Sequence, residues 1–408
     1  MALRPFRRPQ VLGVFVFFGA WLTTELALLL LVGQVIGTIA FIAAGALDDF
    51  IGWVALGITV LSACGLLAIV SISSRTESVF AKALAETLGP EWATLDPDQL
   101  ATRRPMEWSR VAFPFRWRRA GVQRTRNIQY VAGDKSKRHR LDIFRSANTN
   151  PGAPVLLQIH GGAWIISNKD QQGLPLVYHM AERGWICVSI NYALSPRAAW
   201  PNHLIDCKRA LAWVHEHIAE YGGDPNFVVV TGGSAGGHLT AMMALTANDP
   251  RFQPGFESAD TSVRGMVPFY GVYDWTNRYG QRGRRDGMRR FLERTVVKKP
   301  YADAQDVFEI ASPMSHVRAD APPALIIHGD LDTLAPVAEA RAFVRDLRAV
   351  STSPVVYAEL QGAHHAFEVF QSVRTMQTLV AVDRFLTWLV LTEAAKAKPA
   401  TQTQTQSA

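Results

Sequence analysis

The chain has 408 residues, of which 48% are hydrophobic and 19% charged, and its net charge is +7. This length allows one large domain with an appendage, and the high apolar content excludes a chain that is disordered throughout. With only three cysteines, at 64, 187 and 207, the chain has no disulfide framework, and we expect these residues to be structural thiols.

Residues 1–75 are predicted to form a membrane anchor. No Lys or Arg occurs between Arg8 and Arg75. Within this stretch, residues 27–46 and 51–71 each reach the ~20 apolar residues that a spanning helix needs. The Asp48–Asp49 pair between them predicts a turn. The alternative is a buried helical subdomain in a protein that crosses no membrane.

The number of spans decides the predicted side of the membrane. Residues 11–22 are apolar but shorter than the ~17 residues of a minimal span. They either extend the first span, lie in the interface or begin a third helix. With two spans, the arginines on both flanks place both tails in the cytoplasm, so we expect a multi-pass anchor of the cell membrane with a cytoplasmic catalytic domain. A third span would move that domain to the other side.

Residues 76–126 are predicted to be a basic, aromatic juxtamembrane linker. Its arginines are interleaved with Trp108, Phe113, Phe115 and Trp117. Directly after an anchor, this pattern favours contact with anionic membrane lipids. A solvated basic linker is the alternative, and nucleic-acid binding is not expected. At the other end of the chain, the low-complexity residues 393–408 are predicted to be a disordered tail.

From Asn127 the pattern alternates between short apolar runs and longer helical patterns. The expected strands are 128–132, 140–144, 154–160, 186–192, 227–232, 265–270, 324–328 and 355–360, and the expected helices are 170–183, 202–221, 237–247, 337–350 and 374–391. Almost continuously apolar strands are typical of a parallel sheet covered on both faces. The sequence therefore predicts an α/β domain over 127–392, with a mostly parallel eight-stranded sheet and functional groups at the carboxyl ends of its strands.

One predicted strand runs directly into the sequence GGSAGG, which surrounds Ser234. A serine on a cramped turn between strand and helix tolerates only small residues two positions before and after it, here Gly232 and Gly236. The following helix points its N-terminus at the serine and favours negative charge there. Ser234 is thus a candidate nucleophile, although a G-x-S-x-G pattern also arises by chance.

The sequence HGGAW follows another predicted strand. The N–H groups of Gly161 and Gly162, together with that of Ala235, are predicted to form an oxyanion hole. An ordinary strand-end turn is the alternative. His160 is interpreted as a hydrogen-bonding brace for this loop, and Trp164 as packing or a pocket wall.

The last two strands are followed by candidate acids and histidines. Asp332 is the preferred carboxylate for orienting a catalytic histidine, with Asp330 as the alternative. In the sequence QGAHHAF, His365 is preferred over His364 as the general base. The chain order of serine, acid and histidine is the one expected of α/β-hydrolases.

Together these motifs resemble the α/β-hydrolase fold, and in particular the bacterial carboxylesterases of the hormone-sensitive-lipase-like group. The resemblance covers about residues 127–391 and is carried by HGGAWI, NYALSP, YGGDP, GGSAGG and GAHHAF. With its apolar N-terminus the chain is similar to mycobacterial membrane-associated lipase/esterases, and its HGGAWI loop is also similar to that of prenylcysteine methylesterases. Many members of the group carry the acid in a D-P-L-x-D segment, where this chain has GDLDTLAP.

The resemblance implies a catalytic triad of Ser234, Asp332 and His365, with Gly161, Gly162 and Ala235 as oxyanion donors. It implies hydrolysis of a small acyl-ester or lipid substrate through an acyl-enzyme, with membrane lipids as partners. We expect no metal and no organic cofactor, because the chain shows no zinc-ligand spacing and no P-loop. Amide hydrolysis of the arylformamidase type, acyl transfer and a non-catalytic membrane-tethered scaffold are the alternatives.

A basic insertion at about 271–320 is predicted to form a cap. It would favour anionic substrates or contact the membrane, or it is a solvated helical lid.

Overall fold

The computed structural model describes residues 13–100, 104–134, 136–283 and 286–397. Its centre is an eight-stranded sheet in the order β1-β2-β4-β3-β5-β6-β7-β8. The strands are β1 (Val122–Gln129), β2 (Arg140–Ser146), β3 (Ala153–Ile159), β4 (Ile186–Ile190), β5 (Gly223–Gly233), β6 (Gly265–Phe269), β7 (Ala324–Gly329) and β8 (Val355–Leu360). Strand β2 is antiparallel to β1 and β4, and the remaining pairs are parallel. The predicted mostly parallel sheet is therefore confirmed.

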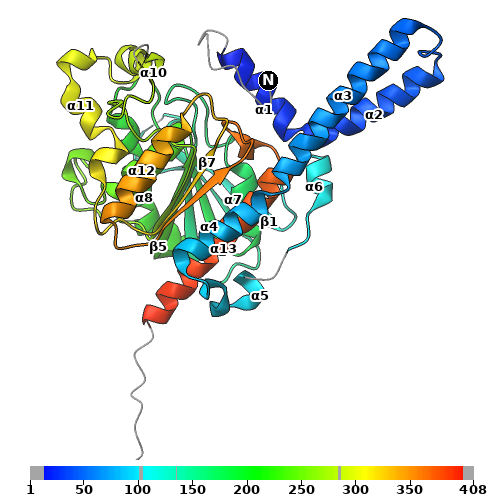
Figure 1. Ribbon diagram of the computed structural model, residues 1–408. Coiled ribbons are helices and arrows are strands. Elements are labelled where there is room, and N and C mark those ends of the chain that lie inside the picture. Colours follow the sequence, from blue (N-terminus) through cyan, green and yellow to red (C-terminus); the bar gives the residue numbers. More distant parts are fainter. Residues whose placement is uncertain (1–12, 101–103, 135, 284–285, 398–408) are drawn as a thin grey trace, which may run out of the picture.

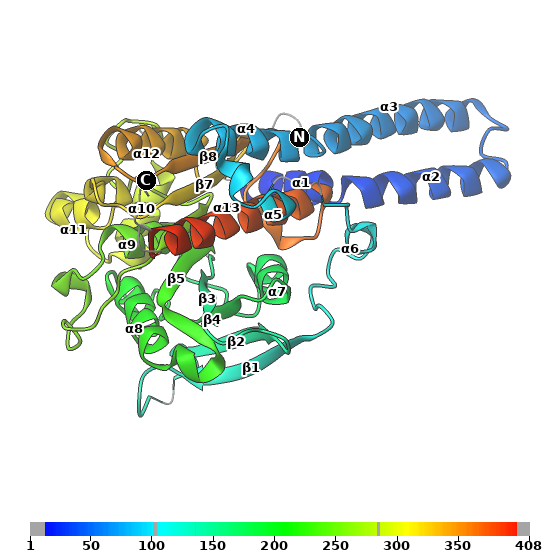
Figure 2. The same ribbon diagram turned by 90° about the horizontal axis from the view of Figure 1, so that it is seen from below.

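Helices cover both faces of the sheet (Figures 1 and 2). They are α7 (Leu174–Glu182), α8 (Asn202–His217), α9 (Ala235–Leu245), α12 (Val337–Val350) and α13 (Val373–Ala397). The short helices α10 (Gly287–Phe291) and α11 (Gln305–Ile310) belong to the insertion between β6 and β7. Because successive side chains of a strand point to opposite faces, the sheet carries two cores. Val155 and Leu157 of β3 pack on the face of α8, α9 and α12, whereas Leu156 packs on the face of α7 and α13.

The N-terminal helices form an arm that projects from this domain. They are α1 (Gly13–Glu25), α2 (Ala27–Ala43) and α3 (Phe50–Ser73), and α2 and α3 run side by side away from the sheet in both views (Figures 1 and 2). The run Phe50–Leu88 is long and apolar enough to cross a membrane, and α1 and α2 together would supply a second, bent span. The segment Phe17–Glu25 meets α2 at an angle of 78°.

The structure corrects the domain boundaries expected from the sequence. Helix α4 (Thr76–Leu88) lies inside the predicted linker, and its Phe80 and Leu84 are buried in the core shared with α13. Helices α5 (Pro97–Leu100) and α6 (Trp108–Ala112) follow, and β1 already begins at Val122. At the other end, α13 continues to Ala397, past the predicted start of the tail, and residues 398–408 lie outside the described residues.

Several arginines of the predicted basic linker pair with carboxylates of the catalytic domain. Arg119 is buried between Glu107 and Glu182, and Arg124 contacts Asp142. These guanidinium groups hold the segment against the sheet, so they are not free to contact anionic lipids. Arg116 and Arg118 remain exposed, beside the exposed rings of Phe113 and Phe115.

Candidate active site

Ser234 occupies the sharp turn between β5 and α9. Its backbone has a positive φ of 60° with ψ −121°, a conformation that costs energy for any residue with a side chain. The turn presses against the end of β3. A Cβ atom would lie 2.5 Å from the carbonyl oxygen of Ile159 at Gly232 and 2.2 Å from it at Gly236. Only glycine fits at these two positions, a stricter limit than the small residues that the sequence predicted.

The structure brings Ser234, His365 and Asp332 together from three separate loops. The Oγ atom of Ser234 lies 2.8 Å from Nε2 of His365. The Nδ1 atom of the same ring lies 2.6 Å from Oδ2 of Asp332. His365 and Asp332 are buried, which shields the contact between them from water, whereas the contact with Ser234 is partly exposed. This geometry lets the imidazole accept the serine proton while the carboxylate fixes the tautomer.

Asp332 is held as an ionised carboxylate. Its second oxygen, Oδ1, accepts hydrogen bonds of 2.8 Å from the N–H groups of Leu334 and Ala335. Burial by itself would raise the pKa of Asp332, but the charge of His365 and hydrogen bonds from His328 and His365 bring this pKa well below its usual range. Asp330, the alternative acid, accepts a hydrogen bond of 2.7 Å from the N–H of Gly362 and braces the turn.

His160, at the start of the oxyanion loop, is packed in the protein interior. The ring of His160 stacks on Tyr192, with centroids 4.4 Å apart, and its Nδ1 atom bonds the carbonyl of Gly161 at 2.7 Å. Burial lowers the pKa of His160 to about 4, so the ring is neutral at physiological pH. Trp164 packs edge-on against Trp275 in the core.

The predicted set of oxyanion donors needs a correction at Gly161. The N–H of Gly161 already donates to Oε1 of Gln172 and so is not free for the role of the other predicted donors. The next residues, Gly162 and Ala163, are left-handed, with φ values of 103° and 51°. Among the described residues, the N–H groups of Gly162, Ala163 and Ala235 have no acceptor. The chain thus offers Ala163 as a donor in place of Gly161.

Three functional neighbours escaped the sequence analysis. The Tyr270 ring lies 4.6 Å from the His365 ring, centroid to centroid, and its hydroxyl donates to Glu368. Nε2 of Gln172 donates to the same hydroxyl at 3.1 Å. The chain of Glu368, Tyr270 and Gln172 therefore links the histidine loop to the oxyanion loop. Burial is the main cause that raises the pKa of Glu368 to about 7. Nothing in the local sequence of Glu368 sets it apart from a surface acid.

The described residues contain no cluster of three or more His, Cys, Asp or Glu side chains that could hold a metal ion. The insertion predicted as a cap is fixed by a buried ion pair of Arg282 with Glu339, whose atoms Nη1 and Oε1 lie 2.6 Å apart.

Comparisons with known proteins agree with this architecture. Residues 141–347 match the family model described as BD-FAE. The chain belongs to the BD-FAE family. It is 43% identical to the probable carboxylic ester hydrolase LipM of Mycobacterium tuberculosis over 98% of this chain and 92% of that one. It is 45% identical to the esterase LipQ of the same organism over 77% of this chain and 75% of that one.

This BD-FAE protein also shares its fold with a solved esterase. The native structure of esterase Est2 from Thermogutta terrifontis aligns with a TM-score of 0.54 at 23% identity, over 73% of this chain and all of that one. The predicted resemblance to α/β-hydrolase carboxylesterases is therefore confirmed, and the protein is a carboxylic ester hydrolase.

Proposed function

We propose that the protein is a membrane-anchored serine esterase that hydrolyses carboxylic esters through an acyl-enzyme. The observation that carries the proposal is the continuous hydrogen-bond chain from Ser234 through His365 to Asp332. A serine hydroxyl is a weak nucleophile at neutral pH, and a base within hydrogen-bond distance activates it.

The reaction follows from the positions of the protons. Nε2 of His365 takes the hydroxyl proton as Oγ of Ser234 forms a bond to the ester carbonyl carbon. The negative charge that develops on the carbonyl oxygen is met by the N–H groups of Gly162, Ala163 and Ala235. The imidazolium then gives its proton to the departing alkoxide as the C–O bond breaks. A water molecule, deprotonated by the same ring, releases the acyl group as an acid and restores the serine.

The N-terminal arm supports membrane anchoring. Its apolar run, Phe50–Leu88, is long enough to span a bilayer. The turn at its tip carries Asp48 and Asp49 and no basic residue, whereas Arg75 follows α3 on the side of the catalytic domain. By the preference of Lys and Arg for the inner side, the catalytic domain lies in the cytoplasm. Sedimentation of the full chain with carbonate-washed membranes tests the anchor, and release into the supernatant would contradict it.

Labelling tests the chemistry. The full chain in detergent is treated with a fluorophosphonate and assayed on p-nitrophenyl esters of increasing acyl length beside N-formyl amides. We expect labelling and ester hydrolysis in the wild type, and loss of both in Ser234→Ala. Labelling that persists in this variant would refute the assigned nucleophile. Cleavage of the amides in preference to the esters would instead identify an amidohydrolase.

A further inference from the structure

Helix α1 lies against the loop that carries His365. This histidine loop, residues 361–372, joins β8 to α13. Nε1 of Trp21 donates a hydrogen bond of 2.8 Å to the carbonyl of Ala366, the residue next to His365. The same indole stacks on Phe370, with ring centroids 4.6 Å apart. The ring of Phe17 faces the imidazole of His365 edge-on at 6.2 Å. The apolar N-terminus thus contacts His365 itself and the part of the histidine loop that follows it.

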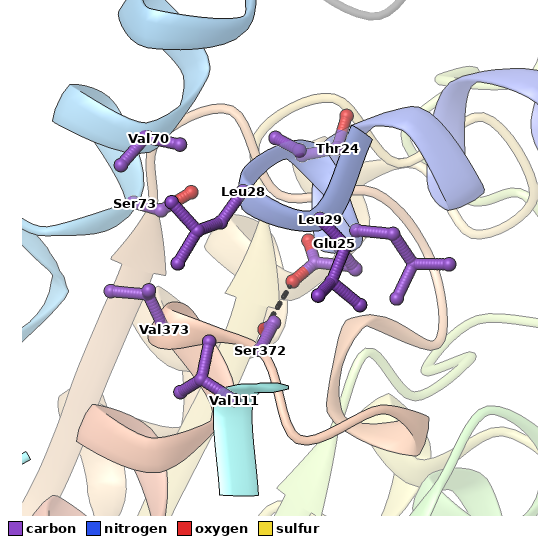
Figure 3. Close-up of a pocket in the computed structure, with 11 residues that line it drawn as sticks. Thr24, Glu25, Leu28, Leu29, Val70, Ser73, Val111, Ser372 and Val373 are labelled. Atoms are coloured by element: carbon purple, nitrogen blue, oxygen red, sulfur yellow. Dashed lines mark hydrogen bonds between the residues drawn. The ribbon is translucent and has the colours of Figure 1, made fainter. Parts of the chain in front are cut away.

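A buried arginine at the start of α13 joins the arm to both ends of this loop. Nε of Arg374 lies 3.2 Å from Oε1 of Glu25, at the bend between α1 and α2. Its Nη1 donates to the carbonyl of Gln361 at 2.6 Å, and its Nη2 donates to Oγ of Ser73, at the end of α3, at 3.1 Å. Ser372 completes the joint with a hydrogen bond of 2.7 Å to Oε2 of Glu25 (Figure 3).

The joint leaves little free space. The cavity between the arm and α13, lined by Glu25, Ser73 and Ser372 among others, has a volume of about 20 Å³ (Figure 3). This volume holds roughly one water molecule. A movement of the arm relative to the domain must therefore move the start of α13 or break the contacts of the buried charges.

The histidine loop contains an unfavourable backbone conformation next to His365. Ala366 has a left-handed backbone, with φ 60°. A left-handed backbone is unfavourable for a residue other than glycine, so it persists only where its surroundings hold it. The indole of Trp21 binds the carbonyl of this residue, one position from the imidazole that must stay 2.8 Å from Ser234.

We propose that Trp21, Glu25 and Arg374 are positioning residues, through which the docked N-terminal arm holds His365 in register with Ser234. The inference rests on the proposed serine mechanism. It means that the arm is part of the catalytic machinery as well as an anchor. A change in the surroundings of the arm, from bilayer to water, then reaches the imidazole through the bend at Glu25.

A purely structural role predicts a different result. Contacts that only stabilise the fold lower the thermal midpoint but leave kcat for each correctly folded site unchanged. Contacts that position the base lower kcat and leave KM nearly unchanged, because substrate binding does not require proton transfer. A misplacement of a reacting group by about 1 Å costs on the order of a hundredfold in rate.

The test uses the full chain in lipid nanodiscs and two matched tryptophan variants. Trp21→Phe keeps the stack on Phe370 but removes the N–H bond to Ala366. The control is Trp53→Phe at the far tip of the arm, where the indole donates a bond of 3.0 Å to the carbonyl of Leu47. Active sites are counted by fluorophosphonate titration, and kcat and KM are measured on one p-nitrophenyl ester. We expect kcat of Trp21→Phe to fall about tenfold with KM unchanged, and both constants of Trp53→Phe to match the wild type.

The charged pair gives an independent measurement. Glu25→Gln leaves Arg374 buried without its counter-ion and is expected to lose kcat together with thermal stability. The double variant Glu25→Gln, Arg374→Gln removes both charges, so stability should recover while kcat stays low. If kcat for each titrated site stays within about twofold of the wild type in the double variant and in Trp21→Phe, the positioning role is refuted. A wild type that neither takes up the label nor cleaves the ester would instead overturn the proposed function.

Discussion

Replacement of Asp332 by asparagine should abolish most of the activity through the tautomer of His365. In the wild type, Oδ1 of Asp332 accepts the N–H groups of Leu334 and Ala335, each at 2.8 Å. An amide nitrogen cannot replace this oxygen, because it would face two further donors. The amide oxygen of the new asparagine therefore stays at this position, and its NH₂ group takes the place of Oδ2, 2.6 Å from Nδ1 of His365.

The asparagine would change which nitrogen of the His365 ring carries the proton. An NH₂ group beside Nδ1 needs an acceptor, so the imidazole proton moves to Nε2. Nε2 then points its hydrogen at Oγ of Ser234, 2.8 Å away, and can no longer take the serine proton. A wrong tautomer of this kind costs on the order of 10⁴ in kcat, or about 5 kcal/mol of transition-state stabilisation.

The assay compares Asp332→Asn with Asp330→Asn on a p-nitrophenyl ester at neutral pH. Asp330 lies two positions away and accepts the N–H of Gly362, a bond that an amide oxygen preserves. Its variant should therefore keep kcat close to that of the wild type. A folded Asp332→Asn variant that retains kcat within about tenfold of the wild type, or an equal loss of activity in both variants, would refute the change of tautomer.

Three further variants test the surroundings of the site. Burial raises the pKa of Glu368 from 4.5 to about 7, so the folded state loses about 3 kcal/mol of stability as pH rises through this interval. Glu368→Gln should remove this loss, which is measured as the difference in unfolding free energy between denaturant titrations at pH 4 and pH 8. If the variant shows the same difference as the wild type, the raised pKa is contradicted. Gly236→Ala places a Cβ 2.2 Å from a carbonyl oxygen of β3 and should lower the thermal midpoint steeply, whereas Gly57→Ala, with open space around its Cβ, should not. Gln172→Leu removes the acceptor that holds the N–H of Gly161 in the oxyanion loop, so kcat should fall on the order of tenfold or more. The control is Gln171→Leu, at an exposed position, which should leave kcat unchanged.

The sheet was predictable because its buried strands give short, nearly continuous apolar runs in the sequence. The apolar run expected at 154–160 is found as β3, Ala153–Ile159, and the run at 355–360 coincides with β8. Strands that are buried on both faces are rich in apolar residues, and an apolar run of only six or seven residues is typical of a strand and short for a helix. Strand β1 was expected at 128–132 but lies at Val122–Gln129, because an edge strand with one exposed side carries a weaker signal.

The boundary of the domain was less predictable. Helix α4 shows an apolar stripe with Phe80 and Leu84, but a stripe does not say what it packs against. Its partner, α13, follows nearly 300 positions later, as the bond between Glu77 and Gln377 illustrates. A segment rich in arginine resembles a solvated linker until the carboxylates that pair with it are located in space.

At the site, the residues that topology brings together were easier to predict than the direction of single N–H groups. Each member of the Ser234, Asp332 and His365 set follows its own parallel strand, so the sheet gathers them at one edge. The oxyanion loop offers no such rule. Its donors depend on the left-handed backbone of Ala163 and on Gln172, which accepts the N–H of Gly161.

The exposed surface and the internal polar contacts of the arm fit the proposed membrane anchor. On α2 and α3, Ile36 is 63% exposed and Leu61 is 74% exposed, as are many apolar neighbours to similar degrees. A water-soluble monomer rarely leaves so extended an apolar surface open. Between the two helices, Nε2 of Gln34 donates to the carbonyl of Thr59 at 2.7 Å, and its Oε1 accepts from Ser62 at 3.3 Å. In hydrocarbon a polar side chain must form its hydrogen bonds within the protein, whereas in water it can form them with the solvent. The bend of 78° between Phe17–Glu25 and α2 lies where the arm meets the domain, beside the histidine loop, so the proposed anchor and the candidate active site share this joint.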